Sequence, residues 1–154
     1  MSAENVEVVR RFESLMVPSL EEDDPSAAER RLREIFDLLD PEVAFHATPS
    51  LPHGGDYVGH DSFVKMGEQF RELWNIPAGV DLEYVDAGGD RVITLASFNL
   101  ESRHTGRSVA VRMVEVVTVR DGRIVDLDAY YRDTVPIIEA AGGAIGKHRE
   151  LGER

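Results

Sequence analysis

The chain has 154 residues, enough for one domain with a sizeable core. It contains no cysteine, which excludes disulfides and thiolate chemistry. Its formal net charge of −12 disfavours nucleic acid and anionic membranes as partners. No apolar stretch approaches the ~20 residues of a membrane span, and no secretory signal is visible at the start, so we expect a cytoplasmic protein.

The first half of the chain predicts helices separated by one strand, from apolar residues at helical spacing and from breaks at Pro and Gly. A capping box at Ser26-Ala-Ala-Glu29 is typical of a helix start, and Asp40-Pro41 ends that helix. The expected elements are a helix over residues 3–17, a loop over 18–25, a helix over 26–39, a strand over 43–48, a loop over 49–57 and a helix from Asp61 or Ser62 to Trp74.

The second half predicts four strands and a short closing helix. The strands cover residues 80–85, 92–102, 108–119 and 123–132, and the helix covers 135–141. Helices followed by a run of strands indicate an α+β fold, with the helices on one face of a mainly antiparallel sheet. We expect a single domain over residues 1–154, with a core over about 5–136 and a C-terminal extension over 137–154.

Glu115 stands out in the third of these strands because nearly every neighbouring residue is apolar. Side chains alternate along a strand, so Glu115 shares a face with Met113 and Val117 and should point inward. A carboxyl group in an apolar interior is costly unless it is used or paired. The alternatives are an ion pair with Arg112 or with a residue on a neighbouring strand, or exposure to solvent if a bulge at Val116-Val117 changes the register.

Several segments together resemble the nuclear transport factor 2-like superfamily, which includes ketosteroid isomerase and the SnoaL-like polyketide cyclases. They are Asp40–His46, Gly55–Phe63, Thr105–Val109, Asp121–Val125 and Tyr130–Asp133. The resemblance covers about Asn5 to Pro136. It implies a cone-shaped, cystatin-like α+β fold in which a curved, mainly antiparallel sheet carries three N-terminal helices. Members share this fold and not one reaction, so the pocket residues have to be interpreted individually.

The resemblance implies a catalytic role for Glu115 and His46. Glu115 stands where ketosteroid isomerase has an aspartic acid that stays protonated and donates to an oxyanion. His46 falls near the general-base carboxylate of that enzyme, at the end of the first strand. A base and a donor on opposite walls of an apolar cavity are what enolisation requires. The alternative for His46 is a hydrogen-bonded strand histidine without a catalytic role.

The chain also departs from known members. Phe12 stands at the position of the isomerase's first tyrosine donor, and Gly67 at that of its third-helix tyrosine. The arginine and two aspartates of the epoxide hydrolases fall near Ala96, Phe98 and Ala129. Neither a steroid isomerase nor an epoxide hydrolase of the known pattern is therefore supported, which leaves the SnoaL-like cyclases as the nearest functional relatives.

The expected substrate-binding residues are mostly apolar or aromatic. They are Phe12, Tyr57, Phe70, Trp74, Phe98, Met113, Ala129 and Tyr131. A packing role is the alternative for Tyr57, Trp74 and Tyr131. His53 and His60 flank a glycine-rich loop, but their spacing matches no known metal site, so we expect no metal and no cofactor.

The leading hypothesis is a cofactor-free enzyme that acts on a hydrophobic cyclic small molecule by general acid/base chemistry. Isomerisation, aldol-type cyclisation and dehydration all fit, with His46 as base and Glu115 as acid. The alternative is a non-catalytic ligand-binding or assembly module of the same fold. Either protein could form a homodimer, common in this family, through the open sheet face bearing Arg112, Val114 and Val116.

Overall fold

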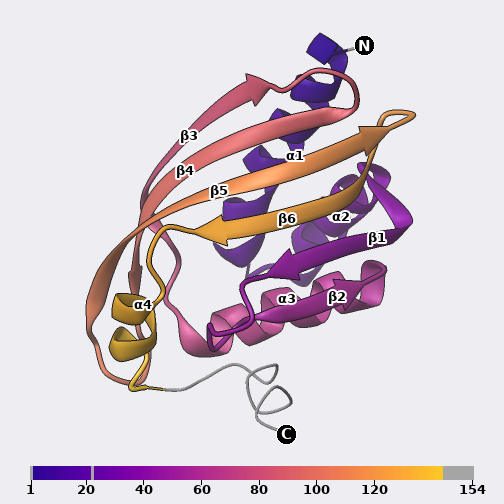
Figure 1. The fold of residues 1–154 in the computed structure, drawn as a ribbon. Helices are drawn as coiled ribbons and strands as arrows, with labels where there is room; N and C mark the ends of the chain where they lie inside the picture. Colours follow the sequence, from indigo (N-terminus) through magenta and orange to yellow (C-terminus); the bar gives the residue numbers. More distant parts are fainter. Residues whose placement is uncertain (1, 22, 144–154) are drawn as a thin grey trace, which may run out of the picture.

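The structure is a computed structural model that describes residues 2–21 and 23–143. Helices cover one face of a strongly curved sheet, and the other face is open (Figure 1). The helices are α1 (Ser2–Glu21), α2 (Pro25–Asp37), α3 (His60–Leu73) and α4 (Val135–Ala140). The strands are β1 (Leu39–Ala47), β2 (Gly55–Val58), β3 (Ala78–Asp86), β4 (Arg91–Glu101), β5 (Ser108–Arg120) and β6 (Arg123–Tyr131).

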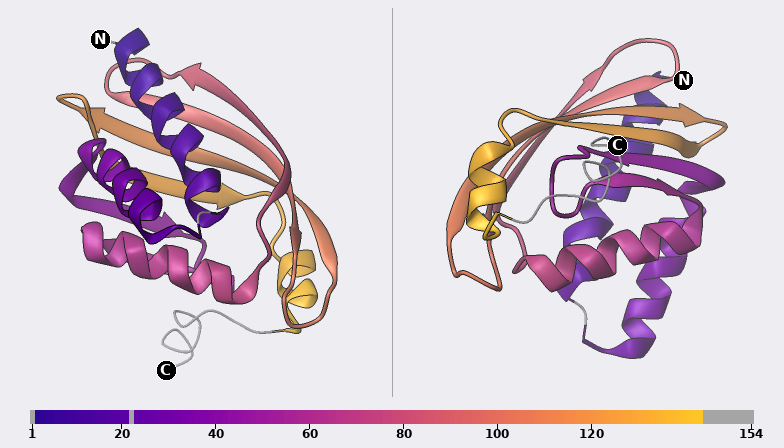
Figure 2. Two further views of the ribbon diagram at one scale, coloured as in Figure 1. Left: turned by 180° about the vertical axis from the view of Figure 1, so that it is seen from behind. Right: turned by 60° about the horizontal axis from the view of Figure 1, so that its bottom comes forward.

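The six strands form one sheet in the order β2-β1-β6-β5-β4-β3. The β1–β6 pair is parallel and every other pair is antiparallel. Helices α1, α2 and α3 lie across the same face of this sheet, as the view from behind in Figure 2 shows, whereas α4 packs against the end of β5. The predicted α+β fold with three N-terminal helices is therefore confirmed.

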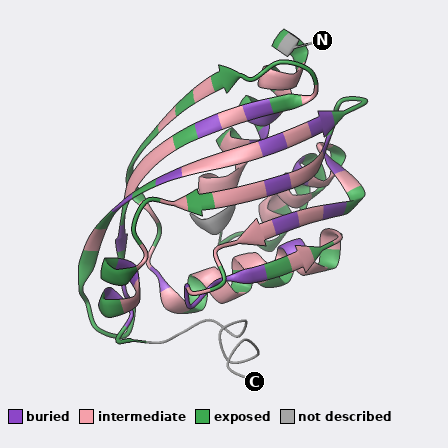
Figure 3. Cartoon of the chain, viewed as in Figure 1, coloured by how far each residue is buried: buried purple, intermediate pink, exposed green. Residues whose placement is uncertain are grey.

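Burial alternates along the strands, as the banding in Figure 3 shows, because one face of the sheet packs against the helices and the other does not. The main core lies under the helices, where the rings of Phe12, Phe45 and Phe63 stand 5.3–6.3 Å apart. A second core around Trp74 and Leu100 lies near α4. The space between these two cores is where the candidate site lies.

Two helix starts differ from the sequence-based predictions. Helix α2 is capped by Asp24, whose carboxylate accepts from the backbone N–H of Ser26 at 3.1 Å, so the capping box predicted at Ser26 is wrong. Pro25 occupies the first helical position, where a missing N–H costs nothing. Helix α3 begins directly after Gly59, which has a φ of 88°, and not at Asp61 or Ser62. Backbone geometry at that glycine, rather than a side-chain cap, starts the helix.

Two predicted loops contain regular secondary structure. Strand β2 begins inside the loop expected over residues 49–57, ends one residue beyond it at Val58, and pairs with β1, with Ala44 opposite Val58. Four residues next to a Pro- and Gly-rich stretch carry too little periodicity to reveal a strand. Helix α1 continues through Pro18 to Glu21, although proline was expected to end it.

The predicted closing helix is confirmed as α4, and residues 144–154 of the expected C-terminal extension lie outside the described residues. Within residues 2–21 and 23–143, no helix is long and apolar enough to cross a membrane.

Candidate active site

A cavity of about 200 Å³ lies between α1, α3 and the covered face of the sheet. Six of the eight predicted substrate-binding residues line it, namely Phe12, Phe70, Phe98, Met113, Ala129 and Tyr131. Tyr57 and Trp74 lie outside this wall. The Tyr57 hydroxyl donates to Gln69 Oε1 at 2.8 Å, and Trp74 is 1% exposed within the second core. The remaining lining is largely apolar, so the cavity suits a hydrophobic molecule.

Glu115 faces this cavity, as strand alternation predicts. In the register of β5 with β6, Glu115 lies opposite Ala129, and Val117 lies opposite Leu127. The register shift between these strands comes only after Thr118, so the inward face stays continuous through Glu115.

The partner of Glu115 is Glu13 of α1, which the sequence analysis missed. The two side chains are hydrogen-bonded to each other, and both line the cavity. Residue 13 lies four positions after Val9 and three before Met16, so helical spacing places it on the buried face of α1. This spacing is the sequence signal that could have identified Glu13 as a buried residue.

The two carboxyl groups are held in their protonated forms more strongly than in water. Burial raises the pKa of Glu13 well above its ordinary value, and the charge of Glu115 raises it further. Burial also raises the pKa of Glu115, while the hydrogen bond with Glu13 opposes that rise. Glu13 Oε1 has no hydrogen-bond partner among the described residues, nor has the hydroxyl of Thr94, which lies opposite Glu115 on β4. The pair therefore retains unused hydrogen-bonding capacity inside the protein.

A buried histidine closes the end of the cavity nearest the second core. His53, in the β1–β2 loop, is 5% exposed, and burial lowers its pKa to about 4. Its Nδ1 lies 3.1 Å from Trp74 Nε1, and its Nε2 lies 3.2 Å from the hydroxyl oxygen of Tyr131. His53 is neutral near pH 7, so it can donate one hydrogen bond and accept another.

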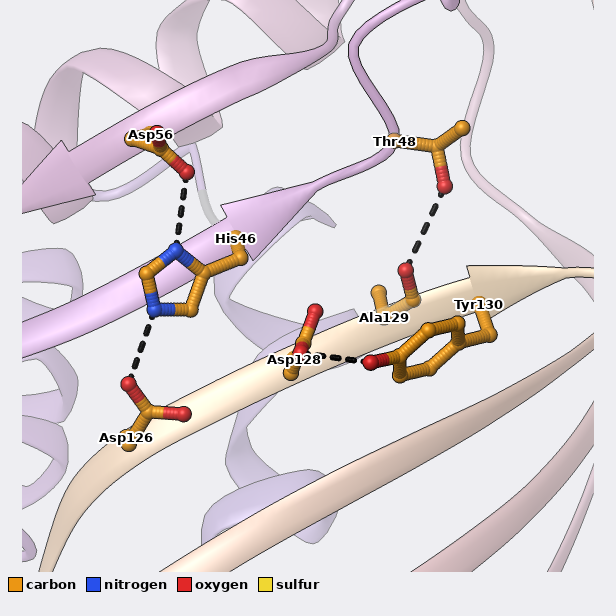
Figure 4. A network of polar contacts seen from close by, with 7 residues as sticks. All are labelled: His46, Thr48, Asp56, Asp126, Asp128, Ala129 and Tyr130. Carbon is orange, nitrogen blue, oxygen red and sulfur yellow. Dashed lines mark hydrogen bonds and ion pairs between the residues drawn. The ribbon is translucent and has the colours of Figure 1, made fainter.

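The ring of His46 lies between Asp56 and Asp126 (Figure 4). Its Nδ1 lies 2.8 Å from Asp56 Oδ1 and its Nε2 lies 2.8 Å from Asp126 Oδ1. Strand alternation turns Phe45 into the core and His46 to the open face of the sheet, although His46 borders the cavity. Both predicted catalytic residues thus border the same cavity, although Asp56 and Asp126 engage both ring nitrogens of His46 on the open face of the sheet.

The surroundings of His46 favour its charged form. The hydrogen bond with Asp56 raises the pKa of His46, partial burial opposes this, and Asp126 adds to the rise. His46, Asp56 and Asp126 thus form a hydrogen-bonded, charge-stabilised cluster on the open face of the sheet. Across the described ranges, no group of three or more His, Asp or Glu side chains is arranged to hold a metal ion.

Comparison with known families identifies the class of protein. Residues 24–127 match the family model of the SnoaL-like domain. The chain therefore belongs to the SnoaL-like domain family, with the NTF2-like and ketosteroid isomerase-like fold that its sequence resembles. None of the curated proteins compared matches it.

Solved structures with the same fold cover nearly the whole chain. An NTF2-like protein from Burkholderia xenovorans LB400 gives a TM-score of 0.76 at 20% identity, covering 92% of this chain and 98% of its own. A candidate isomerase from Rhodopseudomonas palustris gives 0.69 at 18% identity, covering 88% and 96%. TerC, co-crystallised with polyporic acid, gives 0.67 at 18% identity, covering 90% and 98%. At these identities the similarity establishes the fold alone.

Proposed function

We propose that this protein is a cofactor-free enzyme that isomerises, cyclises or dehydrates a hydrophobic cyclic small molecule by general acid/base chemistry. The observation that carries the proposal is the hydrogen-bonded pair Glu13–Glu115 in a largely apolar cavity. The candidate isomerase among the solved relatives, and the crystallisation of TerC with polyporic acid, support a small-molecule role.

The chemistry follows from one proton shared between two carboxyl groups. Ionising both would place two negative charges together in a poorly solvated space, so near neutral pH the pair holds one proton and one charge. The ionised member can remove a proton from a carbon beside a carbonyl group. The protonated member can donate to the oxygen on which negative charge develops.

The general base is therefore assigned to the carboxyl pair and not to His46. Both nitrogens of the His46 ring are engaged by Asp56 and Asp126, on the face of the sheet opposite Glu115. Glu13 shares the cavity with Glu115 and is hydrogen-bonded to it, and its Oε1 has no hydrogen-bond partner among the described residues.

The test measures proton exchange and needs no natural substrate. In D2O, the protein should accelerate deuterium incorporation beside the carbonyl of one or more ketones in a panel of one-ring and two-ring cyclic ketones, followed by NMR. Glu13→Gln and Glu115→Gln should each lower that rate by ~10²-fold or more, because each removes one half of the proton transfer. Glu7→Gln, an exposed substitution on the same helix, is the matched control.

Two results would count against this assignment. Exchange that is absent across the panel, or unaffected in both glutamine variants, would end the catalytic proposal. A ~10²-fold fall in His46→Gln, with both glutamate variants active, would return the role of base to His46.

The second candidate is a non-catalytic ligand-binding protein. It is favoured by Phe12 and Gly67, which line the cavity where the sequence resemblance places the tyrosines of ketosteroid isomerase. Mass spectrometry of molecules released from the purified protein would recover an unchanged apolar ligand in this case, and ketone exchange would be absent.

We also propose a homodimer through the open face of the sheet, in the cytoplasmic location expected from the sequence. This face has a hollow of about 460 Å³ over β3, β4, β5 and β6. Leu95 and Tyr130 border it and are 36% and 56% exposed, while Arg112 lines the same hollow as the acidic Asp81 and Glu83. Exposed apolar side chains with mixed charge around them are typical of interfaces.

A further inference from the structure

We propose that Tyr131 donates a hydrogen bond to an acceptor oxygen of the cavity's ligand, and that His53 and Trp74 hold it in that role. The inference rests on the proposed function only in requiring that the cavity binds a small molecule. It adds a ligand class, namely ring compounds with a carbonyl or equivalent acceptor oxygen at the His53 end.

The β1–β2 loop fixes the position of His53. Leu51 is fully buried in the second core, and the loop folds back so tightly that a Cβ at Gly54 would overlap the carbonyl oxygen of Thr48. The ring of His53 is enclosed by Phe70, Trp74 and Tyr131, with ring centroids 5.4–6.2 Å away. A side chain packed in this way has little freedom to turn.

The direction of the hydrogen bonds follows from the chemistry of Trp74. An indole N–H is a donor only, so Nδ1 of His53, at 3.1 Å, must be the acceptor and carries no hydrogen. A neutral imidazole holds its one hydrogen on the other nitrogen. Nε2 of His53 therefore donates to the hydroxyl oxygen of Tyr131 at 3.2 Å.

The hydroxyl hydrogen of Tyr131 is then left to point elsewhere. Within the described part of the chain, the contact with His53 is the only hydrogen bond recorded for this hydroxyl. Tyr131 lines the cavity, and it lies on the same face of the sheet as Glu115, diagonally across the β5–β6 pair. Burial and the charge of Glu115 raise the pKa of Tyr131, so the hydroxyl keeps its hydrogen.

The cavity consequently has two different polar ends. Tyr131 offers a donor fixed by the Trp74–His53 chain, and the Glu13–Glu115 pair offers a shared proton and a free acceptor oxygen. A ketone bound with its oxygen at Tyr131 would direct its adjacent carbon toward the carboxyl pair. Tyr131 would then stabilise the enolate oxygen.

The first test needs no ligand. In protein labelled with ¹⁵N-histidine, the NMR shifts of His53 should report a hydrogen on Nε2 and none on Nδ1 from pH 5.5 to 8. In Trp74→Phe, which lacks the indole donor, the Nδ1–H form should appear as well. A wild-type His53 that carries its hydrogen on Nδ1, or that is protonated on both nitrogens in this range, would overturn the proposal.

The second test uses 1-tetralone and tetralin, two-ring compounds that differ in one carbonyl group. Wild-type protein should bind 1-tetralone about tenfold more tightly, the value of one good hydrogen bond. The carbonyl stretch of bound 1-tetralone should shift to lower frequency. Tyr131→Phe should abolish the preference and the infrared shift while leaving tetralin affinity unchanged within about twofold.

His53 and Trp74 act through Tyr131, so their variants need a readout that simple packing would not change. His53→Gln keeps an acceptor and a donor and should retain most of the infrared shift, whereas His53→Leu should lose it. Failure of 1-tetralone to bind wild-type protein, or an infrared shift that persists in Tyr131→Phe, would contradict the inference. If the Tyr131-dependent shift is found without any ketone exchange, the inference stands and the proposed catalysis fails.

Discussion

At the scale of single residues, the Glu13–Glu115 pair lowers the stability of the fold at the pH where it would act. Both carboxyl groups have a raised pKa, chiefly through burial. The folded state then holds protons more tightly than the unfolded state. Stability therefore falls as pH rises from the unfolded value, about 4.5, through the raised values.

Removing one of these charges should raise the melting temperature. Glu115→Gln keeps a hydrogen-bond partner for Glu13 without a charge that burial opposes, so Tm should rise by about 3 °C at pH 8, or ~1 kcal/mol. The gain should be smaller at pH 5, because the raised pKa values of the native pair favour its protonated form as pH falls. Differential scanning calorimetry at both values tests this, with Glu7→Gln as control. A gain independent of pH would contradict it.

His46 gives the stability of the fold the opposite pH dependence. Its pKa is raised, chiefly by the hydrogen bond with Asp56, so its charged contacts contribute fully below the unfolded pKa of 6.5. That contribution is lost as pH rises through the folded pKa. His46→Gln should lower Tm more at pH 6 than at pH 9, and equal losses at both would show that charge is not involved. We expect a small effect because the side chain is 38% exposed.

At the scale of elements, substitutions at two glycines show whether close backbone packing shapes the cavity wall. Gly54 leaves no room for a methyl group beside the backbone of Thr48, whereas a methyl group at Gly67 in α3 would meet no atom within 4 Å. Gly54→Ala should destabilise by about 2 kcal/mol or more, because the loop that carries His53 must open. Gly67→Ala should stabilise by about 0.5–1 kcal/mol through helix propensity.

Urea unfolding of both variants measures this difference, and ¹⁵N-histidine NMR shows whether His53 moves. Because the two substitutions add the same methyl group, each serves as the control for the other. Equal effects on stability would indicate that the β1–β2 loop is not constrained by close packing at Gly54.

At the scale of the whole molecule, the open sheet face is the proposed dimer interface. Light scattering after size exclusion should give twice the 17.2 kDa mass of one chain. Leu95→Asp should shift the protein toward one chain, because a charge on an apolar contact must be desolvated. Val135→Asp, at an exposed position on α4, should leave the mass unchanged. A monomeric wild-type protein would contradict the proposal.

The sequence by itself determined the class of fold and the inward direction of Glu115. Both depend on periodicity along one element. Apolar residues at helical spacing gave α1 a buried face, and alternation along β5 placed Glu115 with Met113 and Val117. The same rule, applied to Val43, Phe45 and His46, would have predicted that His46 faces away from the core.

Only the tertiary structure decided which polar groups meet inside the cavity. Glu13 and Glu115 lie 102 positions apart in the sequence, and His53 and Tyr131 lie 78 positions apart. Neither pair belongs to a single helix or strand. Such contacts depend on how α1 is rotated against the sheet, how β6 is aligned with β5, and how the β1–β2 loop folds inward. Periodicity within an element specifies which face a side chain occupies, but the partner on that face is set by packing between elements.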